Sequence, residues 1–137
     1  MKTTEYKKPL PHPTGVSESF WKGLREHRLL VQKCEECGRH VFPPRPFCVY
    51  CLSDHLRWDQ LSGEGIVVSY TIVRRSVVRG FEEDVPYVLA IVELGPNVQM
   101  MTNIIRCPVE KLYVGMRVAA VFEDVTNEFS LVKFCPA

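Results

Sequence analysis

Four cysteines in two CxxC pairs are the residues of this chain best suited to chemistry. They are Cys34, Cys37, Cys48 and Cys51, within the segment CEECGRHVFPPRPFCVYC. Each pair can clamp a metal ion at the tip of a tight turn, and the two pairs together complete a tetrahedron of thiolates. Gly38 follows the first pair and can adopt the positive φ that such a turn needs. The spacing therefore predicts a zinc ribbon.

The same spacing leaves other kinds of site open. Iron in a rubredoxin-like centre also takes four thiolates, whereas a redox pair needs one CxxC at a helix N-terminus and is disfavoured. His40 and His55 lie close enough in sequence to replace a cysteine ligand. Four cysteines already close the shell, so the predicted metal is structural and has no open position for a hydrolytic water.

No second constellation forms a catalytic set. The sequence has no GxSxG, GxGxxG, phosphate-binding loop or HExxH motif. Cys107 and Cys135 lie beside apolar segments and are expected to be buried free thiols, because no base is identified for either. The sequence alone therefore identifies no catalytic residues.

A charged segment between two apolar runs is a candidate ligand contact. Arg74, Arg75 and Arg79 can grip a phosphate or carboxylate, and Phe81 and Tyr87 offer apolar or stacking surfaces. Three consecutive acidic residues, 82–84, follow them. The alternative is an ordinary solvated loop without a ligand.

The elements that must position these residues begin with an arm and a helix. Residues 1–15 contain three prolines and are expected to form an extended tail. Ser17 is a candidate N-cap for an amphipathic helix over Glu18–His27. Phe20 and Trp21 are expected to pack against the rest of the protein, and the alternative is that they form a patch for a partner. Residues 28–32 then lead into Cys34 as a first ribbon strand, and residues 51–58 return as a second.

The remainder predicts a small β-barrel. Five segments rich in Val, Ile, Tyr and Phe are separated by Gly, Pro, Asn or Asp, and they span residues 65–73, 87–94, 98–105, 117–122 and 129–134. Residues 108–112 suit a single helical turn between the third and fourth strands. This order favours an OB-fold barrel, with an SH3-like barrel as the alternative. The expected organisation is mostly β: arm and helix 1–30, zinc ribbon 31–60 and barrel 61–137.

Composition narrows the possible partners. The 137 residues carry a net charge of +1, and residues 61–137 have seven Lys and Arg against nine Asp and Glu. Nucleic-acid binding by the OB barrel is therefore the disfavoured alternative, because phosphate neutralisation supplies much of that affinity. No apolar run is long enough to cross a membrane, and no export signal is evident, so the expected location is the reducing cytoplasm.

Taken together, the motifs resemble a family of small proteins associated with acyl-CoA enzymes. The matching features are the aromatic helix, the Cys34–Gly38 ribbon core, the Pro43-Pro44-Arg45 turn, Cys48 and Cys51, Trp58, the Gly63-Glu64-Gly65 segment, Thr71, Pro86-Tyr87 and the segment Val114-Gly115-Met116-Arg117-Val118. Members have an N-terminal helical arm, a rubredoxin-like zinc ribbon and a C-terminal five-stranded OB fold. They are accessory partners of thiolase-like enzymes.

The resemblance implies a required accessory subunit of a thiolase, acyltransferase or acyl-CoA lyase complex, in which the partner supplies the catalytic residues. Two copies are expected to flank a two-fold catalytic dimer. A CoA ester would be the ligand of the complex, with structural zinc in this chain. Arg45 and Phe47 of the ribbon join Arg74, Arg75, Arg79, Phe81 and Tyr87 as candidate CoA or acyl contacts. An acyl-CoA hydratase is the alternative partner.

Overall fold

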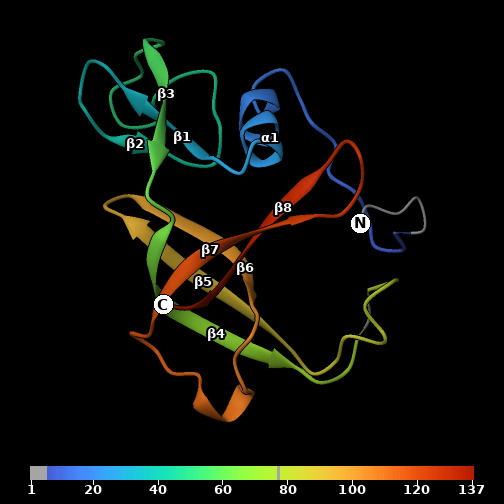
Figure 1. Ribbon diagram of the computed structural model, residues 1–137. Helices are drawn as coiled ribbons and strands as arrows, with labels where there is room; N and C mark the ends of the chain where they lie inside the picture. Colours follow the sequence, from blue (N-terminus) through green and yellow to red (C-terminus); the bar gives the residue numbers. More distant parts are fainter. Residues whose placement is uncertain (1–5, 77) are drawn as a thin grey trace.

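The computed structural model describes residues 6–76 and 78–137 and has three parts (Figure 1). A short helix and a three-stranded sheet precede a five-stranded barrel. In chain order the elements are α1 (Glu18–Arg25), β1 (Leu29–Cys34), β2 (His40–Val41), β3 (Leu56–Leu61), β4 (Glu64–Val73), β5 (Tyr87–Gly95), β6 (Val98–Ile104), the 3-10 helix η1 (Val109–Lys111), β7 (Arg117–Asp124) and β8 (Ser130–Pro136).

Helix α1 is two residues shorter than the sequence predicted. It ends at Arg25, because the N–H of Glu26 bonds back to Lys22 and Gly23, and His27 adopts a φ of 58° that turns the chain toward β1. Ser17 occupies the N-cap position but makes no side-chain cap. Its hydroxyl instead accepts a hydrogen bond from the N–H of Thr14.

The small sheet has the strand order β2-β1-β3. Strand β1 pairs antiparallel with β3 from Leu29, opposite Leu61, to Cys34, opposite Leu56. The returning strand begins later than the predicted 51–58, because residues 51–55 complete a turn in which the N–H of Cys48 bonds the carbonyl of Ser53. The two-residue strand β2 carries too short a pattern to be found from sequence.

The closed barrel confirms the OB-fold prediction over the SH3-like alternative. Its order is β4-β5-β6-β8-β7, with β4 also pairing β7 to close the ring. All neighbours are antiparallel except β6 and β8, which pair in parallel where Ile104 faces Phe134. The five strands begin and end within two residues of the predicted segments, and η1 lies in the predicted helical turn.

One hydrophobic core joins the helix to the barrel. Phe20, Leu24 and Leu29 are buried in the same cluster as barrel residues such as Val92 and Phe134. Helix α1 packs against β1 and β8, so it lies at the junction of sheet and barrel (Figure 1). This packing confirms the predicted role of the aromatic helix. Among the described residues, no helix has the length and apolar character needed to cross a membrane.

Candidate metal centre

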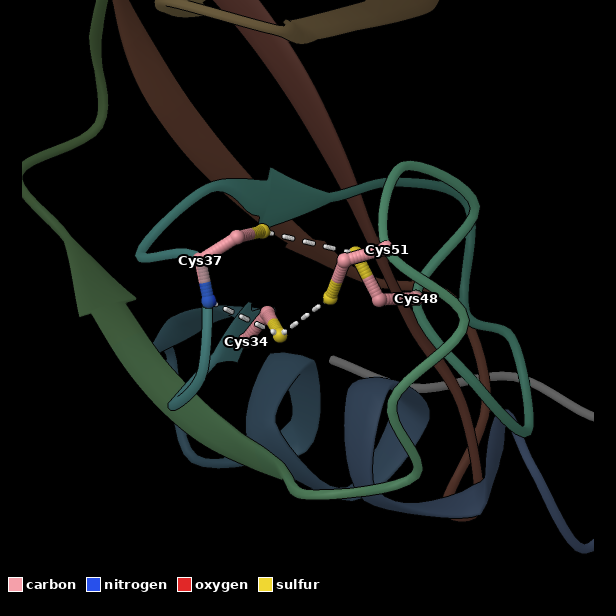
Figure 2. A group of neighbouring side chains, drawn as sticks. All are labelled: Cys34, Cys37, Cys48 and Cys51. Carbon is pink, nitrogen blue, oxygen red and sulfur yellow. Dashed lines mark hydrogen bonds between the residues drawn. The ribbon is translucent and has the colours of Figure 1, made fainter.

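Two loops bring the four cysteine sulfurs together at the end of the small sheet (Figure 2). The four Sγ atoms all lie within 4.8 Å of one another. Cys34 Sγ is 3.6 Å from Cys51 Sγ, and Cys37 Sγ is 3.7 Å from Cys48 Sγ. Cys34 and Cys48 are buried, whereas Cys37 and Cys51 are exposed at the tip. The structure therefore assembles the cluster that the spacing predicted.

The first loop is a tight turn that follows β1. The N–H of Gly38 bonds the carbonyl of Cys34 at 2.9 Å, and the N–H of Cys34 bonds the carbonyl of Arg39 at 2.9 Å. Gly38 has a φ of 77°, a conformation that glycine adopts without a Cβ clash. The backbone N–H of Cys37 also points at Cys34 Sγ, 3.5 Å away. The turn thus aims two sulfurs at one point.

The second loop repeats the first with a leucine in place of the glycine. The N–H of Leu52 bonds the carbonyl of Cys48 at 2.9 Å, and the N–H of Cys48 bonds the carbonyl of Ser53 at 2.8 Å. Leu52 has a φ of 67°, which is unfavourable for a residue with a Cβ. Its side chain is 72% exposed, so burial gives little compensation for that strain.

A buried glutamine holds the chain that leads to the second loop. Gln32 on β1 is buried, and its amide Nε2 donates to the carbonyl of Arg45 at 2.8 Å. Its Oε1 accepts the N–H of Arg45 at 2.7 Å. The Gln32 amide thus makes the two backbone hydrogen bonds at Arg45 that a neighbouring strand would otherwise make. This contact positions the segment that leads to Cys48.

The sulfur geometry fits zinc. A regular tetrahedron with zinc–sulfur bonds of about 2.3 Å has sulfur–sulfur edges of about 3.8 Å. Two of the separations are 3.6 and 3.7 Å, close to that edge, and all six are within 4.8 Å. A closed set of four thiolates has no open position for substrate, so the arrangement can stabilise a fold but cannot activate water.

The local environment pushes the thiol pKa values apart. Burial opposes ionisation of Cys48, but the N–H groups of Cys51 and Tyr50 lower its pKa to about 7. For Cys51 the N–H of Ser53 lowers the pKa, yet burial and three neighbouring cysteines together raise it to about 12. Four thiolates this close repel one another unless a cation lies among them. The donor set therefore fits a divalent cation.

Neither histidine is near enough to replace a cysteine. His40 Nε2 pairs with Asp59 Oδ2 at 2.8 Å, across the small sheet. His55 Nδ1 pairs with Glu36 Oε1 at 2.8 Å. Among residues 6–76 and 78–137, the cysteine quartet is the one group of His, Cys, Asp and Glu with metal-site geometry.

The two remaining cysteines lie outside the centre. Cys107 and Cys135 are both free, but they are half-buried instead of fully buried as the sequence suggested. The thiol of Cys107 donates to the carbonyl of Pro108 at 3.4 Å. Cys135 lies on β8, on the side of that strand whose residues are all partly exposed to solvent.

The candidate CoA contacts form two separate groups. Arg74 and Arg75 are exposed directly after β4, and the rings of Phe81 and Tyr87 are 5.4 Å apart beside a hollow of about 420 Å³. The two ribbon candidates, Arg45 and Phe47, are both exposed. Figure 1 places the β4–β5 loop and the ribbon at different ends of the molecule. The structure does not bring all seven residues to one surface.

Sequence reasoning missed three positioning residues. Leu52 stands four residues after Cys48, as Gly38 does after Cys34, and that shared offset was an available signal. Gln32 interrupts the apolar run of β1, which marks it as a buried polar group. Lys8 lies in the arm expected to be a tail, and no sequence pattern links it to its partner Asp84.

Comparisons with known proteins agree with this architecture. Residues 21–57 match the family model described as ChsH2, rubredoxin-like zinc ribbon domain. Residues 58–123 match the model described as ChsH2, C-terminal OB-fold domain. A DUF35 domain-containing scaffold protein of Methanocaldococcus jannaschii is 34% identical over 110 residues, covering 79% of this chain and 77% of that protein.

Two further relatives are named for enzymes. A probable enoyl-CoA hydratase alpha subunit of Thermomonospora curvata is 33% identical over 131 residues, and this chain spans 40% of its length. The solved structure described as Ltp2-ChsH2(DUF35) aldolase has a TM-score of 0.84 and 28% identity. That similarity covers 93% of this chain and 98% of the other.

Proposed function

We propose that this chain, which belongs to the DUF35 family of zinc-ribbon and OB-fold scaffold proteins, is a non-catalytic subunit of a thiolase-type acyl-CoA enzyme complex. It docks the catalytic subunit and helps to shape the pocket for CoA and the acyl group. The observation that carries the proposal is the similarity along 93% of the chain to a structure described as an Ltp2-ChsH2(DUF35) aldolase. Its relative from M. jannaschii is itself named a scaffold protein.

The metal centre has a structural part in this proposal. Cys34, Cys37, Cys48 and Cys51 would hold one zinc ion, and the ion would fix the two turns at the ribbon tip. Zinc supplies no step of the partner's chemistry, because its four ligands leave no position for substrate. The catalytic subunit would provide the reacting groups, and this chain would provide a docking surface and part of the pocket wall.

The candidate ligand contacts belong to the same proposal. Arg74, Arg75 and Arg79 would contact phosphate or carboxylate groups of a CoA ester, and Phe81 and Tyr87 would pack against its apolar parts. Figure 1 shows the ribbon and the β4–β5 loop at different ends of the molecule. The ribbon residues Arg45 and Phe47 would therefore contact the catalytic subunit or a second part of an extended ligand. Two copies of the chain would flank a two-fold catalytic dimer.

Co-purification tests this function. The chain would carry an affinity tag in its native host, and the recovered complex would be identified by mass spectrometry and weighed intact. We expect a thiolase-like subunit and a mass that fits two copies of each chain. Recovery without any acyl-CoA enzyme, together with unchanged thiolytic activity after deletion of the gene, would overturn the proposal.

A hydratase partner is the second candidate. It is favoured by the relative from T. curvata, which is 33% identical and is named a probable enoyl-CoA hydratase alpha subunit. That relative is much longer than this chain, so its activity can reside in the part to which this chain has no counterpart. The same co-purification separates the two candidates by the identity of the partner.

A further inference from the structure

The N-terminal arm is fastened to the segment that follows β4. We call residues 6–9 the strap and residues 78–86 the loop segment. Lys8 Nζ lies 2.6 Å from Asp84 Oδ2, with 20% of the Lys8 side chain exposed. Burial opposes the charge on Lys8, but its hydrogen bond to Asp84 raises its pKa above the ordinary value. Lys8 is therefore charged at neutral pH and paired with the loop segment.

Aromatic rings extend this contact in both directions. The ammonium group of Lys8 is 5.6 Å from the ring centroid of Tyr6 and 5.1 Å from that of Phe81. Phe81 in turn contacts Tyr87, the first residue of β5, with ring centroids 5.4 Å apart. Lys8 thus links the strap to the loop segment and, through Phe81, to the barrel wall.

A glycine permits the close approach of the two segments. Gly80 has a φ of 92°, and a Cβ built there would lie 2.6 Å from the carbonyl oxygen of Lys7. The N–H of Gly80 donates to the Glu82 carboxylate at 2.9 Å, which holds this conformation. The strap therefore lies against backbone that only glycine allows.

The strap and the loop segment together line an open, basic hollow of about 600 Å³. Lys7 and Lys8 line it from the strap, and Arg79, Gly80 and Glu82 from the loop segment. Lys8 is paired with Asp84, and the Glu82 carboxylate accepts the Gly80 N–H but keeps its negative charge. Lys7 and Arg79 are exposed, and neither makes an ion pair within the described ranges. Two cations that lack an ion-pair partner among the described residues thus line the hollow together with one carboxylate, Glu82, and the lining is net positive.

We propose that the strap completes an anion site in which Lys7 and Arg79 contact a phosphate group and Lys8 is the positioning residue that holds the loop segment. The choice of phosphate rests on the proposed function, since a CoA ester carries phosphates. The contact between the strap and the loop segment is independent of the proposed function, because the Lys8 and Gly80 contacts alone support it. Fixing the loop segment before binding lowers the ordering cost that the ligand would otherwise meet.

Hydrogen exchange of the full chain tests the strap. In Lys8→Met, amides of the loop segment should exchange at least about fivefold faster, because an ion pair and a cation–π contact are lost. Gly80→Ala should also speed their exchange, because the added Cβ would clash with the carbonyl oxygen of Lys7 and separate the two segments. Gly115→Ala is the matched control, since Gly115 has a φ of 94° but no atom within 4 Å of an added Cβ. Unchanged exchange in Lys8→Met, or equal effects of Gly80→Ala and Gly115→Ala on the loop segment, would overturn the strap.

Titration with adenosine 3′,5′-bisphosphate tests the anion site. Lys7→Ala and Arg79→Ala should each weaken binding at least about fivefold, the loss expected for a charged hydrogen bond. Lys22→Ala on α1 should leave the affinity unchanged. Absent binding, or equal binding by Lys7→Ala and wild type, would overturn the anion site. Failure to recover an acyl-CoA enzyme would instead count against the proposed function and leave the exchange result standing.

Discussion

The two cysteine turns differ in the residue that adopts the left-handed conformation, and in the second turn that residue is strained. Gly38 and Leu52 occupy equivalent positions with φ values of 77° and 67°. A left-handed conformation costs a residue with a Cβ about 1–2 kcal/mol relative to glycine. Leu52 is exposed, so little burial offsets that cost.

Leu52→Gly should therefore stabilise the zinc-loaded protein. We expect the free energy of unfolding to rise by about 1 kcal/mol, measured by urea denaturation in buffered zinc. Leu52→Ala is the control, because it removes the side chain and keeps the strained Cβ. If Leu52→Ala stabilises the protein as much as Leu52→Gly does, the exposed side chain and not the backbone explains the effect.

A second residue-scale prediction concerns the ion pair across the small sheet. The hydrogen bond from His40 lowers the pKa of Asp59 below its ordinary value of 3.8. Because the folded-state pKa is the lower one, this carboxylate stabilises the fold fully above the unfolded value. Its contribution is lost as the pH falls through the folded value.

Asp59→Asn should accordingly destabilise the protein near neutral pH and lose that effect in acid. The measurement is the difference in unfolding free energy between variant and wild type across pH 7 to 3. Glu128→Gln, at an exposed turn, supplies the matched loss of one charge. A difference that stays constant over this range would contradict the assigned pKa shift.

At the scale of elements, β4 and β5 approach so closely that one strand position excludes a Cβ. A Cβ on Gly65 would lie 2.5 Å from Val92 Cγ1 and 2.9 Å from the carbonyl oxygen of Glu93. Val92 is fully buried and cannot move aside. The Gly63-Glu64-Gly65 segment therefore reflects packing at the start of the barrel.

Gly65→Ala should destabilise the barrel by about 1–3 kcal/mol, the usual cost of overpacking a core. Thermal unfolding would show the loss as a lower midpoint. Gly15→Ala, where an added Cβ meets no atom within 4 Å, should leave the midpoint nearly unchanged. Equal midpoints for Gly65→Ala and wild type would mean that β4 shifts without cost.

The elements were predictable where their patterns were long. The barrel strands carry alternating or continuous apolar runs bounded by turn residues, so their positions could be predicted closely. The cysteine spacing predicted which four sulfurs meet. The start of β3 was misplaced because residues after Cys51 serve a turn whose hydrogen bonds leave no trace in composition. The Lys8–Asp84 contact joins residues far apart in the chain, which a single sequence cannot reveal.

For the whole molecule, the ribbon and the barrel differ in how much apolar surface holds them. The core cluster at the ribbon tip consists of Cys34, Val41 and Cys48, with Leu56 packed against it. The main core instead joins α1 and Leu29 to the barrel. A tip with so small a core depends on its metal for stability.

Metal removal should therefore unfold only part of the chain. With a chelator, residues 34–55 should lose protection from hydrogen exchange, while α1 and the barrel keep theirs and complex formation is lost. Cys34→Ser should reproduce this pattern without the chelator, and Cys107→Ser should retain one zinc per chain. Full protection of residues 34–55 in metal-free protein would contradict a structural role for zinc.

The closed barrel also limits how this protein can join another chain. The ring β4-β5-β6-β8-β7 gives every barrel strand two neighbours, so no barrel strand has a wholly free edge to which a partner strand could add along its length. Two seams are short, however, because β4 pairs β7 only over residues 64–66 and β6 pairs β8 only at Ile104. The small sheet is open, with β2 and β3 at its two edges, and β2 is only two residues long. Backbone-to-backbone recognition within the described sheets is thus available along β3 and along the stretches of β4 and β6 that the short seams leave without a ladder partner. Elsewhere, a partner must recognise side chains on the surface, and these can differ between relatives while the barrel backbone stays the same.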